Sequence, residues 1–307
     1  MKGGGEIINV LSLFDGMSCG QIALERAGIH VDKYYASEID KYAIAETMAN
    51  YPNTIQLGCV IKIKGGELPK IDLLMGGSPC QGFSSSGKRL NFDDPRSKLF
   101  FEFVRVLHET KPKYFLLENV VMTQKHQDII SEHLGILPIK INSALVSAQN
   151  RERLYWTNIP GVSQPEDKGI CLTDILENVG EPAMLNKGSI LGRRLNSKGR
   201  REDYNKDIPI TQCLEVRASN RNKSNCMTTV AKDNVLTSLP IGRHPDAFER
   251  KLPFRYYTVK ECCRLQTVPE DYFKVSSENQ IRKMLGNGWT VDVIAHILHN
   301  LPNSKPL

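Results

Sequence analysis

Residues 7–16 read Ile-Ile-Asn-Val-Leu-Ser-Leu-Phe-Asp-Gly, an apolar and β-prone run that ends at a turn. Such a run predicts a buried strand that stops at the Asp-Gly pair. Apolar residues at helical spacing follow from Ile22 to Ala27, and Gly28 ends that helix. A strand, a glycine-bearing turn and a helix in this order are typical of the α/β class.

The first half of the chain repeats this alternation of strands and helices. Alternation of this kind predicts an α/β fold with a doubly wound, Rossmann-like parallel sheet. From about Thr157 the pattern gives way to polar sequence with short strands. Further strands are expected at 34–37, 71–75 and 114–117, and further helices at 99–107, 258–265 and 291–301.

The composition excludes several classes of protein. The chain has 307 residues, 40% of them hydrophobic, which suffices for one large domain with a smaller partner. No apolar run approaches the roughly 20 residues that a membrane-spanning helix needs, so no membrane partner is expected. The eight cysteines include no Cys-x-x-Cys pair, which indicates a reduced, cytoplasmic compartment and no metal site.

The formal net charge of +6 is concentrated in one segment. Residues 186–232 contain eleven Lys or Arg and four Asp or Glu, so the rest of the chain is close to neutral. A basic segment is compatible with a solvated surface as well as with nucleic-acid binding. Charge alone leaves both interpretations open.

The first turn and the second strand together indicate a nucleoside-containing ligand. Backbone N–H groups of the turn at 14–20 can approach a carboxylate or a phosphate. Glu38 stands at the end of the second strand, where its carboxylate could accept both ribose hydroxyls. The pattern Gly-x-Gly-x-x-Gly is absent here, which favours a cofactor without a pyrophosphate.

The segment Gly76-Gly77-Ser78-Pro79-Cys80-Gln81-Gly82-Phe83-Ser84 carries the clearest chemical signal. It follows a buried strand, so Cys80 is expected at the carboxyl edge of the sheet, where such folds bind ligands. A buried structural thiol is the plain alternative. However, the surrounding Gly and Ser offer no apolar cover, and Lys88, Arg89 and Arg96 lie nearby to favour a thiolate.

Two further segments place polar side chains near the same edge. Glu118 follows four core residues of another strand, which directs it toward the Cys80 segment. A helix cap or a solvated strand end would be the ordinary role of such an acid. In 147–156, strand alternation would put Gln149, Arg151 and Arg153 on one face.

In this order and spacing, Ser-Pro-Cys-Gln at 78–81, Glu-Asn-Val at 118–120 and Gln-x-Arg-x-Arg at 149–153 resemble the cytosine-5 DNA methyltransferase family. The resemblance covers nearly the whole chain except a polar stretch near 157–250. Several segments are similar to the animal de novo enzymes. The loop from Cys80 to Leu99 looks more like the bacterial and phage restriction-modification enzymes.

The resemblance implies transfer of a methyl group from S-adenosyl-L-methionine to C5 of a flipped cytosine in duplex DNA. Cys80 would attack C6 of the base, and Glu118 would engage N3 and the amino group. Arg153 would hold the O2 atom, and Arg151 would support the loop and a phosphate. A thiolate added to C6 turns the ring into an enamine, which makes C5 nucleophilic.

The resemblance also implies a cofactor site without a metal, and S-adenosyl-L-homocysteine as the second product. Cys59 stands where the family usually has an Asp that bonds the adenine amino group, and a thiol is a poorer acceptor. The residues expected around the cofactor are Phe14, Asp15, Gly16, Met17, Cys19, Glu38, Ile39, Cys59, Val60, Pro79, Leu99, Asn287 and Trp289.

The domain organisation follows from these assignments. Residues 1–156 and 257–307 are expected to form the catalytic domain, and 157–256 an inserted target-recognition domain. The protein is expected to be a monomer. It is expected to act in the bacterial cytoplasm and to be encoded by a bacterium or a phage. Arg193, Arg194, Arg200 and Arg201 are expected to hold phosphates. Further DNA contacts are expected from Gln81, Ser84, Lys88, Arg89, Arg221, Lys223 and Asn225.

Two other functions fit the same motifs. An RNA methyltransferase of the same fold, acting on transfer RNA, could share Cys80 and Glu118. A catalytically inactive regulator that binds cofactor and DNA would be expected to have lost one of these two residues, and both are present.

Overall fold

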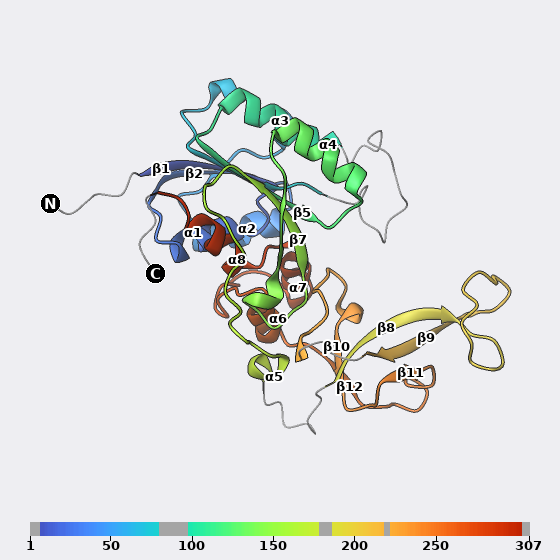
Figure 1. Ribbon diagram of the computed structural model, residues 1–307. Helices are drawn as coiled ribbons and strands as arrows, with labels where there is room; N and C mark the ends of the chain where they lie inside the picture. Colours follow the sequence, from blue (N-terminus) through green and yellow to red (C-terminus); the bar gives the residue numbers. More distant parts are fainter. Residues whose placement is uncertain (1–6, 80–97, 178–185, 218–221, 303–307) are drawn as a thin grey trace.

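The computed structural model describes residues 7–79, 98–177, 186–217 and 222–302. Figure 1 shows a larger sheet with helices on both faces and a smaller sheet beside it. The predicted α/β fold with a doubly wound sheet is confirmed. None of the helices in the described ranges combines the length and the apolarity needed to span a bilayer.

The larger sheet has seven strands in the order β3-β2-β1-β4-β5-β7-β6. β1 to β5 are parallel, whereas β7 runs antiparallel to both β5 and β6. The link from β6 to β7 is too short for a parallel crossover, which needs a dozen or more residues. The strands are β1 (Ile8–Leu13), β2 (Val31–Ser37), β3 (Ile55–Gln56), β4 (Leu73–Gly77), β5 (Tyr114–Val120), β6 (Ile139–Asn142) and β7 (Glu152–Thr157).

Alternate side chains of the central strands supply two separate cores. Val10 and Leu116 face α1, α2 and α8, whereas Leu11 and Leu117 face α3 and α4. The C-terminal segment therefore returns to cover the sheet, and the helix expected at 291–301 is present as α8. The helices are α1 (Cys19–Arg26), α2 (Lys41–Asn50), α3 (Lys98–Thr110), α4 (Gln124–Leu134) and α8 (Val291–Leu298).

Three further helices lie below the larger sheet in Figure 1, and their buried apolar residues belong to the larger core. The helix expected at 258–265 begins with a capping box, in which Thr258 accepts the backbone N–H of Glu261 and Glu261 accepts that of Thr258. These helices are α5 (Leu172–Ile175), α6 (Val259–Leu265) and α7 (Glu278–Asn287).

The smaller sheet is antiparallel throughout and has the order β11-β9-β8-β10-β12. Ile190, Leu214 and Val235 belong to its own small core. The long β8–β9 hairpin projects away from the body of the molecule (Figure 1). The strands are β8 (Asn186–Arg194), β9 (Ile210–Val216), β10 (Val235–Thr237), β11 (Gly242–His244) and β12 (Phe254–Tyr256).

Two segments expected in the smaller domain are attached to the larger one. Ile159, Leu172 and Ile175 pack in the larger core. Between β9 and β10 the chain also returns to the larger domain, where Ser224 pairs with Gln149 as an isolated parallel bridge. The backbone N–H of Ser224 donates to Ala148 at 2.6 Å.

Candidate active site

The turn after β1 is an unusual piece of backbone. Phe14, Gly16 and Ser18 all have a φ near +60°, a conformation that only glycine adopts at low cost. Asp15 stabilises this turn from inside, because its carboxylate accepts hydrogen bonds from Ser18 Oγ and, at 2.7 Å, from the hydroxyl of Tyr34. Its side chain is 9% exposed and is engaged within the turn, so its expected place beside the cofactor stays a prediction.

Burial also changes the chemistry of this turn. Loss of solvation raises the pKa of Asp15 to about 6, although hydrogen bonds from Ser18, Ser12 and Tyr34 oppose the change. Burial likewise raises the pKa of the Cys19 thiol to about 12, which makes it an inert packing residue. Met17 is buried as well, and its carbonyl accepts the hydroxyl of Tyr272 at 2.5 Å.

Glu38 is fixed across the open side of the turn. One carboxylate oxygen accepts the backbone N–H of Gly16 at 2.7 Å. The other accepts the N–H groups of Ile39 and Asp40 at 2.7 and 2.8 Å. One lone-pair direction of Oε2 remains free, and Ile39 beside it is 74% exposed.

The remaining expected cofactor residues differ in how they are exposed. Cys59 is half-buried and precedes a short 3₁₀ turn at Val60–Lys62. Val60 packs in the core, and its carbonyl accepts the guanidinium of Arg105 at 3.0 Å. Leu99 is partly buried on α3, and Pro79 is exposed at the end of the described strand segment.

Glu118 lies within β5, two residues before its end, and is only 9% exposed. Arg153 on β7 contacts one carboxylate oxygen through Nε at 2.9 Å. Trp289 donates its indole N–H to the other oxygen at 3.2 Å. The carboxylate is therefore held by two donors from two different segments.

Cys80, Gln81, Ser84, Lys88, Arg89 and Arg221 lie outside the described residues, so their expected roles stay predictions. The residues just before the Cys80 segment nevertheless lie beside β5, the strand that carries Glu118. Asn119 donates to the side-chain oxygen of Ser78 at 3.1 Å, which fixes the entrance to the Cys80 segment beside β5.

Gln149 and Arg151 precede β7, so the expected strand face holds only Arg153. Arg151 is 4% exposed and donates to the carbonyls of Met227 at 2.8 Å, Gly288 at 2.9 Å and Gly286 at 3.3 Å. It holds the loop at Met227 against the end of α7, and its buried guanidinium faces carbonyls and not a phosphate in solvent. Tertiary contacts caused this difference, and strand alternation could not reveal them.

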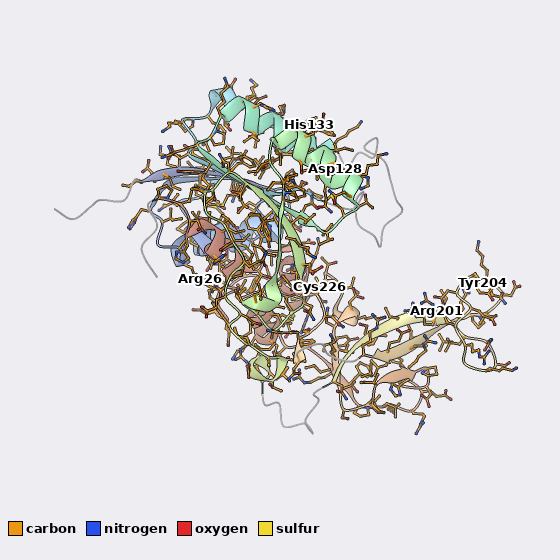
Figure 2. All side chains as sticks on the ribbon, viewed as in Figure 1. Arg26, Asp128, His133, Arg201, Tyr204 and Cys226 are labelled. Carbon is orange, nitrogen blue, oxygen red and sulfur yellow. The ribbon has the colours of Figure 1, made fainter. Side chains whose placement is uncertain are left out.

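The loop held by Arg151 is also pressed against α7. A Cβ atom on Gly286 would lie 2.3 Å from the carbonyl carbon of Thr228 and 2.5 Å from the amide nitrogen of Thr229. Only glycine permits this approach of two backbones. Cys226 of the same loop lies at the junction of the two domains, as Figure 2 shows.

Lys223 does not face DNA, which corrects the sequence-based expectation. Its side chain is buried, and Nζ donates to the carbonyls of Ile170 at 2.5 Å, Ala144 at 2.6 Å and Ser147 at 3.0 Å. All three donors of the ammonium group are thus used within the protein. Asn225, two residues later, is half-buried.

The basic segment of the smaller sheet is organised around Glu215. Arg193, Arg217 and Arg243 contact its carboxylate at 2.8, 3.2 and 3.3 Å. Burial would raise the pKa of Glu215, but hydrogen bonds from Arg193 and Arg217 lower it to about 2. Sequence counting missed this cluster because Arg243 lies outside the basic segment.

Two other expected phosphate-binding arginines, Arg194 and Arg201, have local partners, whereas Arg200 is exposed. Arg194 donates to the carbonyls of Ile208 and Lys206. Arg201 pairs with Asp203 at the far end of the β8–β9 hairpin, where Figure 2 also shows Tyr204. Among the described residues, no group of three His, Cys, Asp or Glu side chains is placed to hold a metal ion.

Comparison with known proteins extends these observations. The family model for C-5 cytosine-specific DNA methylases matches residues 8–303. The type II methyltransferase M1.ScrFI of Lactococcus lactis subsp. cremoris is 31% identical over 304 residues, which cover 90% of this chain and 74% of that protein. The orphan methyltransferase M.Rho11sI of Bacillus phage rho11s is 36% identical over 210 residues. That match covers 62% of this chain but only 39% of the phage protein, so it spans less than half of that relative's length.

Solved structures share the fold at low sequence identity. The methyltransferase EhMeth of Entamoeba histolytica matches with a TM-score of 0.69 at 17% identity, covering 96% of this chain and 98% of that one. The S. pombe Dnmt2 methyltransferase matches with a TM-score of 0.66 at 20% identity, covering 95% of this chain and 97% of that one.

Proposed function

Because the chain belongs to the family of C-5 cytosine-specific DNA methylases, we propose that it methylates C5 of a cytosine in duplex DNA with S-adenosyl-L-methionine. One observation carries this proposal. The buried carboxylate of Glu118 is held by Arg153 and Trp289 next to the strand that leads into the Cys80 segment. This is the arrangement that an acid acting on a bound base requires.

The cofactor turn fits S-adenosyl-L-methionine. Glu38 keeps one lone-pair direction of Oε2 free for a ribose hydroxyl, and the exposed Ile39 offers an apolar surface for the adenine. A Cβ built on Gly16 would meet no atom within 4 Å, so space is open there. Asn287 and Trp289 would close the site from the end of α7. The bound cofactor supplies an activated methyl group.

Three side chains would then act on the bound cytosine. The Cys80 thiolate adds to C6 of a cytosine that has left the base stack, while Glu118 shares a proton with N3. Arg153 keeps Glu118 in place and would hold O2 of the base. After C5 has been methylated, loss of its proton and departure of the thiolate restore the C5–C6 double bond.

DNA would lie against the face of the smaller sheet that carries the Glu215 cluster. The strand register places Arg193, Glu215 and Arg243 on one face. Leu236 lies on this same face and packs in the larger core, so the face turns toward the catalytic domain. Arg217 and Arg243 are the more exposed members of the cluster, which suits contact with phosphates.

Other parts of the assignment rest on sequence alone. Asn225 and the residues outside the described ranges, among them Gln81, Ser84, Lys88, Arg89 and Arg221, would contribute further DNA contacts. The catalytic domain would comprise 1–156 and 257–307 together with the segments near 159–175 and 222–229, which pack against it. Curated relatives from bacteria and phages support a role in the cytoplasm of a bacterial host.

Expression in a host that lacks cytosine methylation tests the function directly. Bisulfite sequencing of the host DNA should show protected cytosines in one sequence context, and Cys80→Ser should abolish the protection. Protection with Cys80→Ser, or methyl transfer to transfer RNA in place of DNA by the purified protein, would contradict the proposal.

A further inference from the structure

Trp289 makes a contact that a cofactor-binding role alone does not explain. Its indole N–H donates to Glu118 Oε2 at 3.2 Å, while Arg153 Nε contacts Oε1 at 2.9 Å. Both oxygens of the carboxylate are thus engaged, and both side chains that engage them are largely buried. The indole lies within the site and directly beside the acid.

The absence of a side chain at Gly77 leaves room for Trp289 beside Glu118. Gly77 on β4 stands opposite Glu118 in the strand register. A Cβ atom on Gly77 would lie 2.9 Å from Trp289 Nε1 and 3.0 Å from Glu118 Oε2. A side chain at position 77 would therefore push the indole and the carboxylate apart.

The second tryptophan shows that a buried indole does not need a carboxylate. Trp156 is fully buried on β7 and donates to the hydroxyl of Ser131 at 3.0 Å. A neutral acceptor satisfies that N–H group. At position 289 the acceptor is instead the group that acts on the base.

We propose that Trp289 is a positioning residue that sets the orientation of the Glu118 carboxylate before the cytosine enters, an inference that rests on the proposed function. The terminal torsion of a glutamate is soft and has no sharp minima of its own. Donors on both oxygens fix it. Each oxygen then keeps a lone-pair direction free, one for the amino group of cytosine and the other for the proton shared with N3.

The test uses Trp289→Phe, which keeps an aromatic ring and removes only the N–H group. Two duplexes are compared, one with cytosine at the target position and one with 2-pyrimidinone, which lacks the amino group. Loss of one charge-assisted hydrogen bond should slow single-turnover methylation of cytosine by about 10- to 100-fold. Adduct formation with 2-pyrimidinone should slow clearly less, because one of the two oriented contacts is absent from that base.

Trp156→Phe is the matched control, since it removes a buried indole N–H from a neutral acceptor. It should lower the unfolding midpoint and leave the rates on both duplexes as in wild type. Rates on both duplexes are compared at saturating S-adenosyl-L-methionine, and equilibrium binding of the cofactor to Trp289→Phe is measured separately. This measurement separates a positioning effect from loss of the cofactor site.

Wild-type rates for Trp289→Phe on cytosine would overturn the inference, as would equal slowing on both duplexes. Absence of methyl transfer by the wild-type protein on any duplex would instead overturn the proposed function. The two failures are therefore distinguishable in one set of measurements.

Discussion

Glu118 and Glu215 are both strand carboxylates beside guanidinium groups, and they have opposite roles. Around Glu118 one buried arginine and one indole hold a single carboxylate in place. Around Glu215 one carboxylate holds three arginines, two of which are 34% and 60% exposed in their side chains. The two exposed arginines around Glu215 are available to a ligand, whereas the partners of Glu118 are largely buried. In the larger sheet the arginine positions the acid, whereas in the smaller sheet the acid positions the arginines.

The largest expected effect tests the Glu118 half of this comparison. Glu118→Gln keeps the size of the side chain and removes the proton that it shares with N3, so the single-turnover rate should fall on the order of 10²-fold or more. Cofactor affinity should stay unchanged. Glu152→Gln, a half-exposed carboxylate on the adjacent strand β7, is the control and should retain the wild-type rate. Equal rates for Glu118→Gln and wild type would assign the acid elsewhere.

The next prediction concerns Lys223 and asks whether this buried lysine stabilises the fold or binds DNA. Lys223→Met removes three charge-assisted hydrogen bonds and leaves three carbonyls without that donor. The free energy of unfolding should fall by about 3–5 kcal/mol, measured by denaturant titration. The salt dependence of DNA binding should not change. A reduced salt slope with normal stability would return Lys223 to the DNA interface.

Asp15 provides a buried carboxylate with no cationic partner among its described contacts. The folded-state pKa of about 6 lies above the ordinary value of 3.8, so the folded protein binds the proton more tightly than the unfolded chain. Stability from this group is fully present below pH 4 and is lost as the pH rises through 6. Asp15→Asn removes the titration. Its unfolding free energy relative to wild type should therefore rise by on the order of 3 kcal/mol between pH 4 and pH 7. A difference that does not vary with pH would contradict this.

The smallest effect concerns the exposed arginines around Glu215. Arg217→Ala and Arg243→Ala should each reduce the slope of log affinity against log salt by roughly 0.9, measured by fluorescence anisotropy with duplex DNA. Arg250→Ala is the control, because that arginine pairs with Asp246 in a turn of the same domain. If the cluster variants keep the wild-type slope, DNA follows another path across the protein.

The sequence predicted best those features that depend on local patterns of apolar residues. The strand before the turn, the placement of Glu118 on a core strand and the presence of a C-terminal helix follow from apolar periodicity. That periodicity gave no sign of the inward turn of Asp15 or the burial of Lys223, because both depend on partners far away in the chain. The sequence motif containing Arg151 was recognisable, but its role became clear only from the carbonyls of Met227 and Gly288.

The contact between Gly286 and the backbone at Thr228 and Thr229 bears on how such a protein can change its specificity. The smaller sheet is not an interchangeable module joined by two linkers, because the segment between β9 and β10 is clamped to α7 and to Arg151. A chimaera that receives the whole segment from β8 to β12 from a relative should pack poorly against α7. Recombination that exchanges only β8 to β9, and separately β10 to β12, keeps residues 222–229 with their host. We expect new target preferences to be obtained more readily by this divided exchange.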